Sequence, residues 1–356
     1  MTAKQLLLPI LLIASISMVQ SQTLRNAGGP LSKDSAWYGT QQSLNVAANV
    51  LMLQHENGGW PKNIKFYGET LTPDQISKYK AQYADVEETT IDNSATYSEM
   101  LFVAKMYQAT KDEVYKTAFL KGLAFMQFLQ YPNGGFKQFA RDKGYYTHIT
   151  YNDNAMLNVM SMMNAVALGN PLFAGITDKK DQDKAKASFD KGIDCILKTQ
   201  YLQNGKKTVW CAQHDEKTLL PAKARAYELP SLSGQESVGL VMLLMDLPNP
   251  SPTVKEAVDG AIAWFEANRI RDHRVQLFTN AEGEPDRRWV ESTGGDDLWG
   301  RFYELDTNKP YVCDRDGIIK YDLSEIGYER RNGYSWYGSS PLKAIEKYAK
   351  WKKKND

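Results

Sequence analysis

Hydrophobic positions along the chain follow two helical patterns that alternate with each other. In the segment 181–198 (DQDKAKASFDKGIDCILK), the apolar residues recur at every fourth position: Ala185, Phe189, Ile193 and Leu197. This spacing predicts a helix with one buried face. The later residues of three other segments are apolar nearly all round: 93–107, 153–168 and 234–247. A helix of that second kind must be covered on every side.

The two kinds of helix belong to an internal repeat of roughly 75 residues. A one-faced helix ends in a Gln and a glycine-containing turn at three places: 46–61, 122–137 and 192–207. A longer loop and an all-round apolar helix follow each time. Further one-faced helices are expected over 253–269 and 340–351, with strand-like pieces at 274–280 and 287–293. Alternating outer and inner helices build a double ring. The sequence therefore predicts a mainly α fold, an incomplete α/α toroid of about three hairpin repeats with a few short strands.

Residues 1–21 resemble a secretory signal. Lys4 provides a basic start, LLLPILLIASISMV an apolar run, and Val19-Gln20-Ser21 a small-residue cleavage site before Gln22. The apolar run is too short for a membrane span, and no later stretch is long and apolar enough for one. We therefore expect a secreted protein, extracellular or periplasmic, with no membrane insertion. The remaining segment 22–356 lacks a Gly/Ser-rich or Pro-rich linker, which favours a single domain. We expect the protein to be a monomer.

The composition limits which ligands and partners the protein is expected to bind. The formal net charge of +1 argues against a nucleic-acid binder held by bulk charge. The three cysteines, Cys195, Cys211 and Cys313, show no CxxC spacing, so zinc is not expected; a Cys195–Cys211 disulfide and buried free thiols both remain open. Many of the 20 Tyr and 8 Trp stand beside Gly, Asn or Asp. Aromatic faces on loops suit sugar rings, with ordinary packing as the alternative for any single ring.

Two of the inner helices begin with clusters of oxygen-bearing side chains. Asp92 and Asn93 precede one, and Asn152, Asp153 and Asn154 precede the next. Asp or Asn at such a place is ordinarily an N-cap. If the inner helices lie side by side and start at the same level, however, the clusters become neighbours. Oxygen-only donors suit Ca²⁺, but the spacing is not that of an EF-hand, so capping and calcium binding both remain open.

Arginines are expected at the same face. Arg225 lies just ahead of the third inner helix, and Arg301 and Arg315 follow in the Trp/Tyr/Arg-rich region. A salt bridge is the alternative for each, above all for Arg315 between Asp314 and Asp316. Carboxylates, a bound cation and several arginines on one face would suit an anionic ligand.

Seven motifs together resemble the catalytic module of polysaccharide lyase family 10, the pectate lyases. In chain order they are NGGWPKN, TIDNSATYSEM, YNDNAM, KARAYELPSLSGQES, DLWGRFYEL, KPYVCDRDG and YERRNGYSWYG. Each motif alone is weak, but the set keeps its order and spacing from about residue 35 to 350 and is specific.

The resemblance implies roles for individual residues. Asp92 and Asp153 match the residues that hold Ca²⁺ against the substrate carboxylate, and Asn93 lies in the same motif. Arg225 and Arg301 match arginines that bind uronate carboxylates. Arg315 matches the catalytic base. The remaining residues that we expect near the sugar are Asn154, Lys62, Asn63, Trp60 and His148.

The implied reaction is β-elimination on α-1,4-polygalacturonate (pectate). A base removes the C5 proton, which is α to a carboxylate, and the 4-oxygen leaves, so the product is a 4,5-unsaturated oligogalacturonate. Ca²⁺ and arginines at that carboxylate stabilise the enolate-like charge. An arginine base is unusual because a guanidinium ordinarily has a pKa above ~12. Two alternatives remain: a glycoside hydrolase on an α/α scaffold, which would need paired carboxylates, and a uronan-binding protein without activity.

Overall fold

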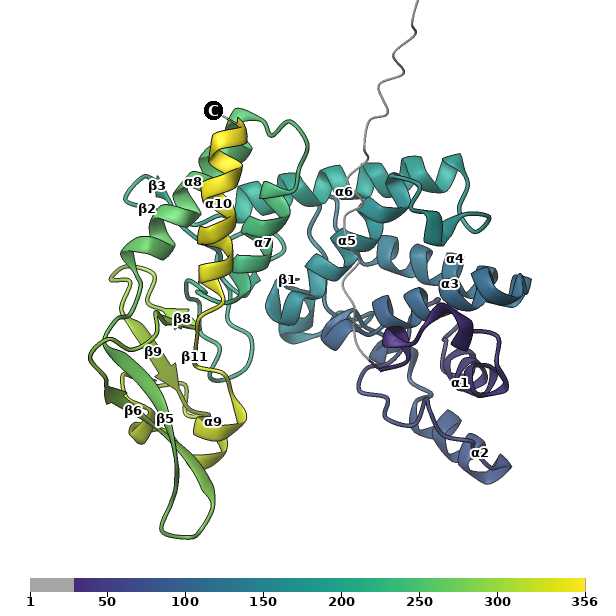
Figure 1. Cartoon of the computed structure of the whole chain (residues 1–356), viewed down its shortest axis with the longest axis horizontal. Coiled ribbons are helices and arrows are strands. Elements are labelled where there is room, and N and C mark those ends of the chain that lie inside the picture. Colours follow the sequence, from purple (N-terminus) through teal and green to yellow (C-terminus); the bar gives the residue numbers. More distant parts are fainter. Residues whose placement is uncertain (1–28, 356) are drawn as a thin grey trace, which may run out of the picture.

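The computed structural model describes residues 29–355 (Figure 1), so the predicted signal segment 1–21 lies outside the described residues. The longer helices are α1 (Gln41–Met52), α2 (Pro73–Gln82), α3 (Tyr97–Thr110), α4 (Glu113–Phe128), α5 (Ala155–Ala167), α6 (Lys179–Thr199), α7 (Glu236–Met245), α8 (Pro252–Ala267), α9 (Tyr328–Gly333) and α10 (Pro341–Asn355). The strands are β1 (Ile149–Thr150), β2 (Leu202–Gln203), β3 (Lys206–Lys207), β4 (Gln213–His214), β5 (His273–Thr279), β6 (Pro285–Glu291), β7 (Trp299–Gly300), β8 (Phe302–Tyr303), β9 (Pro310–Cys313), β10 (Ile319–Lys320) and β11 (Tyr337–Gly338). The predicted mainly α fold with short strands is confirmed.

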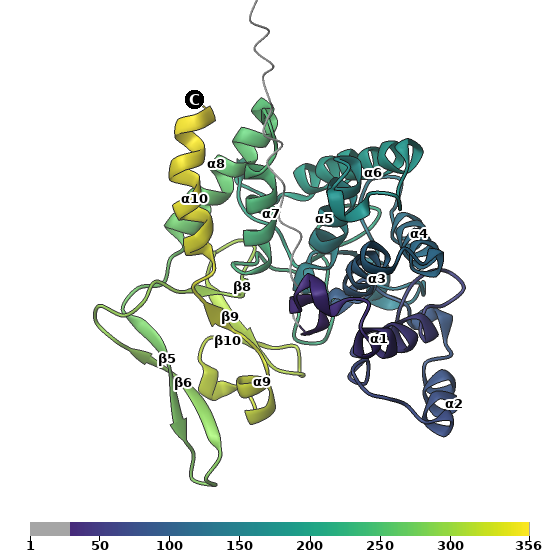
Figure 2. The ribbon, with the colours of Figure 1, turned by 45° about the vertical axis from the view of Figure 1, so that its right-hand side comes forward.

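The two helix patterns correspond to two environments. α3 packs against α4, α5 against α6, and α7 against α8 and α10, while α3, α5 and α7 contact one another in that order. Figure 2 shows α3 and α5 on the inner side of α4 and α6. Nearly every residue of α5 is buried, whereas α6 buries one side only. The apolar residues of the inner helices are therefore covered on all sides, as the sequence predicts.

A glutamine just after each of α1, α4 and α6 ties that helix to the next outer helix. Its side-chain amide donates one hydrogen bond to its own turn and another to a carbonyl of the following outer helix. Gln54 donates to the backbone carbonyls of Gly58 and Ala118. Gln130 donates to those of Gly134 and Ser188, and Gln200 to those of Thr208 and Ala257. Because the same link recurs three times, successive repeats keep similar relative heights.

Two of these turns require glycine. Gly58 and Gly134 have φ of +90° and +93°, and a Cβ on them would lie 2.1 Å from the Lys121 carbonyl oxygen and 1.9 Å from that of Lys191. Only glycine combines a positive φ with so close an approach to a neighbouring helix. The NGG turns are thus contact points between repeats.

A strand-rich region follows α8. β5 and β6 pair antiparallel from His273↔Glu291 to Thr279↔Pro285, and the hairpin extends away from the helices (Figure 1). A three-stranded sheet has the order β10-β9-β8, and β11 pairs with β7. This region has a small core of its own, made of Tyr227, Phe302, Tyr311, Val312, Cys313, Leu323, Ile326, Tyr334 and Trp336. Arg301 and Arg315 lie in this region.

Two sequence expectations bear on covalent and membrane chemistry. Cys195, Cys211 and Cys313 are free and buried, so the disulfide alternative is wrong and the thiols belong to the packed interior. Among residues 29–355, no helix combines the length and apolar character needed to cross a bilayer. The single-domain prediction for 22–356 stays a prediction.

Candidate active site

Two short turns open the inner helices α3 and α5. The turn η4 (Asp92–Ser94) precedes α3, and η6 (Asn152–Asn154) precedes α5. Asn93 and Asp153 both have φ of 51°, in the left-handed region that non-glycine residues rarely adopt. Neither helix receives a side-chain cap: the N-cap residues are Thr96 and Asn154, without a cap hydrogen bond. The capping alternative is therefore wrong for Asp92 and Asp153.

The two turns lie against each other, as the sequence predicts. η4 contacts both η6 and α5, and the Asn158 side-chain amide on α5 donates to the Ser94 hydroxyl at 3.2 Å. η6 in turn contacts α7, the third inner helix. The oxygen-bearing clusters, about sixty residues apart in the chain, thus form one polar surface at the helix starts.

Asp92 is the more buried of the two aspartates, with 4% of the residue exposed. One carboxylate oxygen, Oδ2, pairs with the Lys62 ammonium, while the buried Oδ1 has no hydrogen-bond partner among the described residues. A buried carboxylate oxygen without a donor or cation is costly. Its oxygen-only chemistry fits a hard cation such as Ca²⁺.

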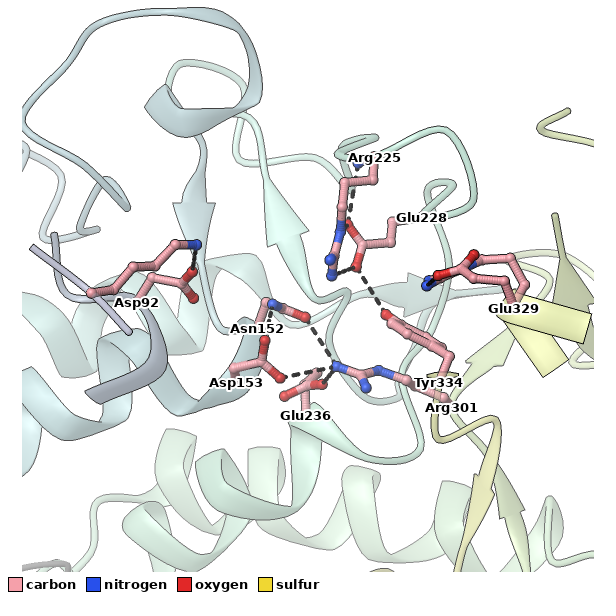
Figure 3. Close-up of polar contacts among 11 residues, drawn as sticks. Asp92, Asn152, Asp153, Arg225, Glu228, Glu236, Arg301, Glu329 and Tyr334 are labelled. Atoms are coloured by element: carbon pink, nitrogen blue, oxygen red, sulfur yellow. Dashed lines mark hydrogen bonds and ion pairs between the residues drawn. The ribbon is translucent and has the colours of Figure 1, made fainter. Parts of the chain in front are cut away.

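Arg301 joins the starts of α5 and α7 (Figure 3). Its Nη2 donates to Glu236 Oε1 at 2.6 Å, to Asn152 Oδ1 at 3.1 Å and to Asp153 Oδ1 at 3.3 Å. The Asn152 amide also donates to Asp153 Oδ2 at 2.7 Å. Only 6% of the Arg301 side chain is exposed, so this guanidinium fixes the Asp153 carboxylate from the protein side.

Glu236 is a site residue that the sequence analysis missed. Burial raises its pKa to about 7, although the charge of Arg301 acts to lower it and that of Asp153 to raise it further. Its position in the sequence could have identified it, because Glu236 is the first residue of α7, the third inner helix. An acidic residue there corresponds to the acidic turns that open α3 and α5.

A second arginine is held by another buried glutamate. Arg225 Nε donates to Glu228 Oε2 at 2.8 Å, and a guanidinium Nη2 donates to Oε1 of the same carboxylate. The Tyr334 hydroxyl also donates to Glu228 Oε1, at 2.8 Å. Burial acts to raise the pKa of Glu228, but the hydrogen bonds and charge of Arg225 outweigh it and the pKa is lowered. Arg225 keeps 41% of its side chain exposed, so it can bind a ligand.

Two tyrosine rings organise the guanidinium groups. Tyr227 and Tyr334 pack edge to face with ring centroids 5.4 Å apart. Three guanidinium carbons lie over the Tyr227 ring, and their distances to its centroid are 4.4 Å for Arg330, 5.1 Å for Arg225 and 5.9 Å for Arg315. The guanidinium carbon of Arg301 lies 4.5 Å from the centroid of the Tyr334 ring. Aromatic faces attract such cations and lower the cost of grouping them. The structure therefore brings together the three arginines singled out in the sequence and adds Arg330.

Arg315 occupies the outer edge of this cluster, after β9. Its side chain is 66% exposed and its Nη2 donates to Glu329 Oε2 at 3.2 Å. The flanking aspartates have other partners: the Gly327 backbone N–H donates to Asp314, and the Lys320 ammonium to Asp316. An exposed ion pair contributes about 0–1 kcal/mol, so the salt-bridge alternative does not immobilise Arg315.

Other predicted residues divide between this surface and its surroundings. The Asn93 amide donates to Asn63 Oδ1 at 3.0 Å, which joins the Lys62–Asn63 loop to η4. Asn154 directly follows Asp153 and is half-buried. His148 instead lies beside Glu216, with 3.3 Å between Nδ1 and Oε2. His148, Asp215 and Glu216 form the one group of His, Cys, Asp or Glu within residues 29–355 that is close enough for a shared metal. A sugar contact for His148 stays a prediction.

The predicted sugar contact through Trp60 is wrong. Its ring is fully buried, and its indole N–H donates to the Val50 carbonyl in the last turn of α1. The same bond recurs from Trp210 to Ile196 of α6 and from Trp299 to Phe265 of α8. These carbonyls near the helix ends need donors, so the tryptophans serve packing rather than ligand binding.

Comparisons with known proteins identify the family of this chain. The family model for pectic acid lyase matches residues 54–345. A family 10 polysaccharide lyase from Cellvibrio cellulosa is similar in structure, with 35% sequence identity and a TM-score of 0.74. A point mutant of a family 10 lyase from the same organism, in complex with trigalacturonic acid, gives 34% identity and the same TM-score. Each comparison covers 89% of this chain and 95% of the other. No curated protein matches the chain. With its family model spanning most of its length, the chain belongs to the pectic acid lyases and is a pectate lyase.

Proposed function

We propose that this pectate lyase cleaves α-1,4-polygalacturonate by Ca²⁺-assisted β-elimination, with Arg315 as the base that takes the C5 proton. The observation that carries the proposal is the meeting of the acidic turns η4 and η6 with the arginines grouped around Tyr227 and Tyr334. Such a surface presents both a cation site and guanidinium groups to one uronate carboxylate. That a related lyase was obtained with trigalacturonic acid supports the substrate class.

Asp92 and Asp153 are the residues that would hold calcium. The unpartnered Asp92 Oδ1 and the half-exposed Asp153 carboxylate supply oxygen donors. Ca²⁺ takes about 6–8 oxygen ligands, so two carboxylates leave places for the substrate carboxylate and water. When bound, the ion would neutralise the uronate carboxylate and acidify its C5–H. Lys62, already paired with Asp92, offsets the charge of that aspartate in the absence of the ion.

The arginines divide the remaining work according to their exposure. Arg301 is buried and bonded to three acceptors, so we propose that it orients Asp153 as well as facing the substrate carboxylate. Arg225, more exposed and fixed by Glu228, binds the carboxylate directly and stabilises the charge that develops on it. Arg315 is only loosely paired with Glu329, and we propose that its neutral guanidine form is the base. It takes the C5 proton and becomes guanidinium, the C5–H electron pair forms the C4–C5 double bond, and the 4-oxygen leaves and takes a proton from water.

Three further proposals concern the whole protein. The α3/α4, α5/α6 and α7/α8 pairs form the inner and outer layers of an incomplete α/α toroid, supported by the order of their contacts. The protein is exported, supported by the signal-like sequence 1–21. It acts as a monomer, which is the state expected from the sequence.

An absorbance assay on polygalacturonate tests this function. The new C4–C5 double bond absorbs in the ultraviolet, so elimination is expected to give rising absorbance that a calcium chelator abolishes and added Ca²⁺ restores. Arg315→Ala is expected to lose nearly all activity while remaining folded. Arg271→Ala is the matched control, because Arg271 is 65% exposed and also pairs with a carboxylate.

Each competing outcome has its own meaning. New reducing ends without absorbance would indicate hydrolysis, and binding of polygalacturonate without any product would indicate a uronan-binding protein. Full activity in Arg315→Ala would remove the base assignment. Activity that is indifferent to chelator would remove calcium from the mechanism.

A further inference from the structure

A cavity of about 250 Å³ adjoins the proposed active site on the α1 side. It lies between α1, the loop that follows α1, the short helix η1 (Gly29–Ser32) and the start of α3. Lys62, Asn63 and Asn93, which belong to the site surface, also line this cavity. Pockets for drug-sized ligands run to about 300–1,000 Å³, so a cavity of this size suits a single sugar ring.

The lining contains both apolar and polar residues. Its apolar members include Leu31, Val46, Val50, Ile64 and Phe102. Ser94, Ser98, Tyr67, Glu99 and the two asparagines supply polar atoms. A sugar ring has the matching character, with C–H groups on its faces and hydroxyls on its edge. Apolar and polar residues contribute equally to this lining, and small-molecule sites likewise combine apolar surface with a few placed polar groups.

Two buried polar groups in this lining lie beside each other. Glu99 is 7% exposed, and neither its Oε2 nor the Tyr67 hydroxyl makes a well-formed hydrogen bond among the described residues, although Tyr67 acts to lower the pKa of Glu99. Burial raises the pKa of Glu99 to about 7. Native proteins leave few buried polar atoms unpaired. Together the two groups offer a donor and acceptors that hydroxyl or carbonyl groups of a ligand would satisfy.

The charges in the cavity disfavour an anion. Glu99 is the acidic group of the lining, and the one cation in that lining, Lys62, is already paired with Asp92. A free uronate carboxylate placed there would meet a buried carboxyl with no counter-ion, which is unfavourable in a low-dielectric environment. An uncharged sugar avoids this cost.

We propose that the Glu99–Tyr67 cavity is a subsite for an uncharged unit of the pectic chain, either a methyl-esterified galacturonate or a neutral sugar, next to the galacturonate being cleaved. The inference rests on the proposed function, since it places the cavity along the same substrate. The enzyme would then prefer chains in which a free galacturonate has an uncharged neighbour.

The test compares kcat/KM for three oligosaccharides of equal length: fully de-esterified, carrying one methyl ester, and carrying one neutral sugar. For the wild type we expect a preference for the uncharged unit. Ser98→Phe fills the cavity from α3 and is expected to lower the ratio of uncharged to de-esterified kcat/KM about tenfold, the size of one lost pocket contact. The ratio does not depend on how much of the variant is folded, because active concentration cancels.

Two further variants sharpen the result. Glu99→Gln removes the charge but keeps the shape, and it is expected to lower the same ratio by improving the de-esterified substrate. Ser77→Phe, on exposed α2, is the matched control and should keep the wild-type ratio. A preference for the ester alone or for the neutral sugar alone would identify which unit binds. Equal ratios in wild type, Ser98→Phe and Glu99→Gln would overturn the subsite, whereas absence of unsaturated product from every oligosaccharide would overturn the proposed function itself.

Discussion

Replacing Glu99 by Gln should make the protein more stable at high pH. The carboxyl is buried at the base of α3, and burial raises its pKa from the ordinary 4.5 to about 7. Backbone hydrogen bonds and Tyr67 act in the opposite direction but do not cancel this effect. The folded protein therefore holds the Glu99 proton more tightly than the unfolded chain does.

The sign and the size follow from proton linkage. Between pH 4.5 and about 7 the unfolded chain releases the proton while the folded protein retains it, so stability falls as pH rises through this window. One pKa unit corresponds to about 1.4 kcal/mol, and the difference between 4.5 and 7 therefore amounts to about 3 kcal/mol. Glutamine has nearly the same shape and does not ionise, so the variant escapes this loss.

The measurement is urea unfolding of wild type and Glu99→Gln at a series of pH values. We expect similar free energies of unfolding near pH 4 and a growing advantage for the variant that levels off above about pH 7. Glu346→Gln on α10, where the residue is exposed, is the control for loss of one negative charge. An advantage that is constant with pH, or largest in acid, would refute the reasoning.

Three other substitutions test the site and its support. Arg301→Ala leaves Glu236 without its cation, so we expect a loss of about 3–5 kcal/mol in urea unfolding together with loss of activity; unchanged stability would contradict the buried ion pair. Glu228→Gln loosens the hold on Arg225 and should raise KM for polygalacturonate more than it lowers kcat, a split that steady-state kinetics would reveal or exclude. Gly192→Ala puts a Cβ 2.2 Å from the Met160 sulfur and should cost about 1–3 kcal/mol in thermal unfolding.

Periodicity was sufficient to predict the helical repeat. The one-faced and all-round apolar segments correspond to α4, α6 and α8 outside and α3, α5 and α7 inside. α2 escaped prediction because none of its residues is buried, and a helix without an apolar stripe leaves no periodic signal. A local signal was present, since Thr72, Pro73 and Gln75 form a capping box with proline in the first turn.

Only some residues of the candidate site could be predicted from the sequence. Asp92, Asp153 and the arginines were found because they stand at helix starts or in recognisable motifs. Glu228 and Glu236 were missed, since their importance lies in pairing with Arg225 and Arg301 rather than in local spacing. Arg301 meets Asn152 across 149 positions of sequence, and such a contact depends on how the repeats and the strand region pack.

The division of charge between two parts of the fold explains why a site forms at all. The carboxylates of Asp92 and Asp153 belong to the helical repeats, where the glutamine links keep consecutive inner helices in a similar register. Arg301 and Arg315 belong to the strand-rich region with its own small core. Arg301 joins the two parts by inserting its charge between Asp153 and Glu236. In the proposed function, an acidic sugar at this junction would lie between the proposed cation site on one side and guanidinium groups on the other. Both parts can then stabilise negative charge on one carboxylate, which is the requirement for removing the proton beside it.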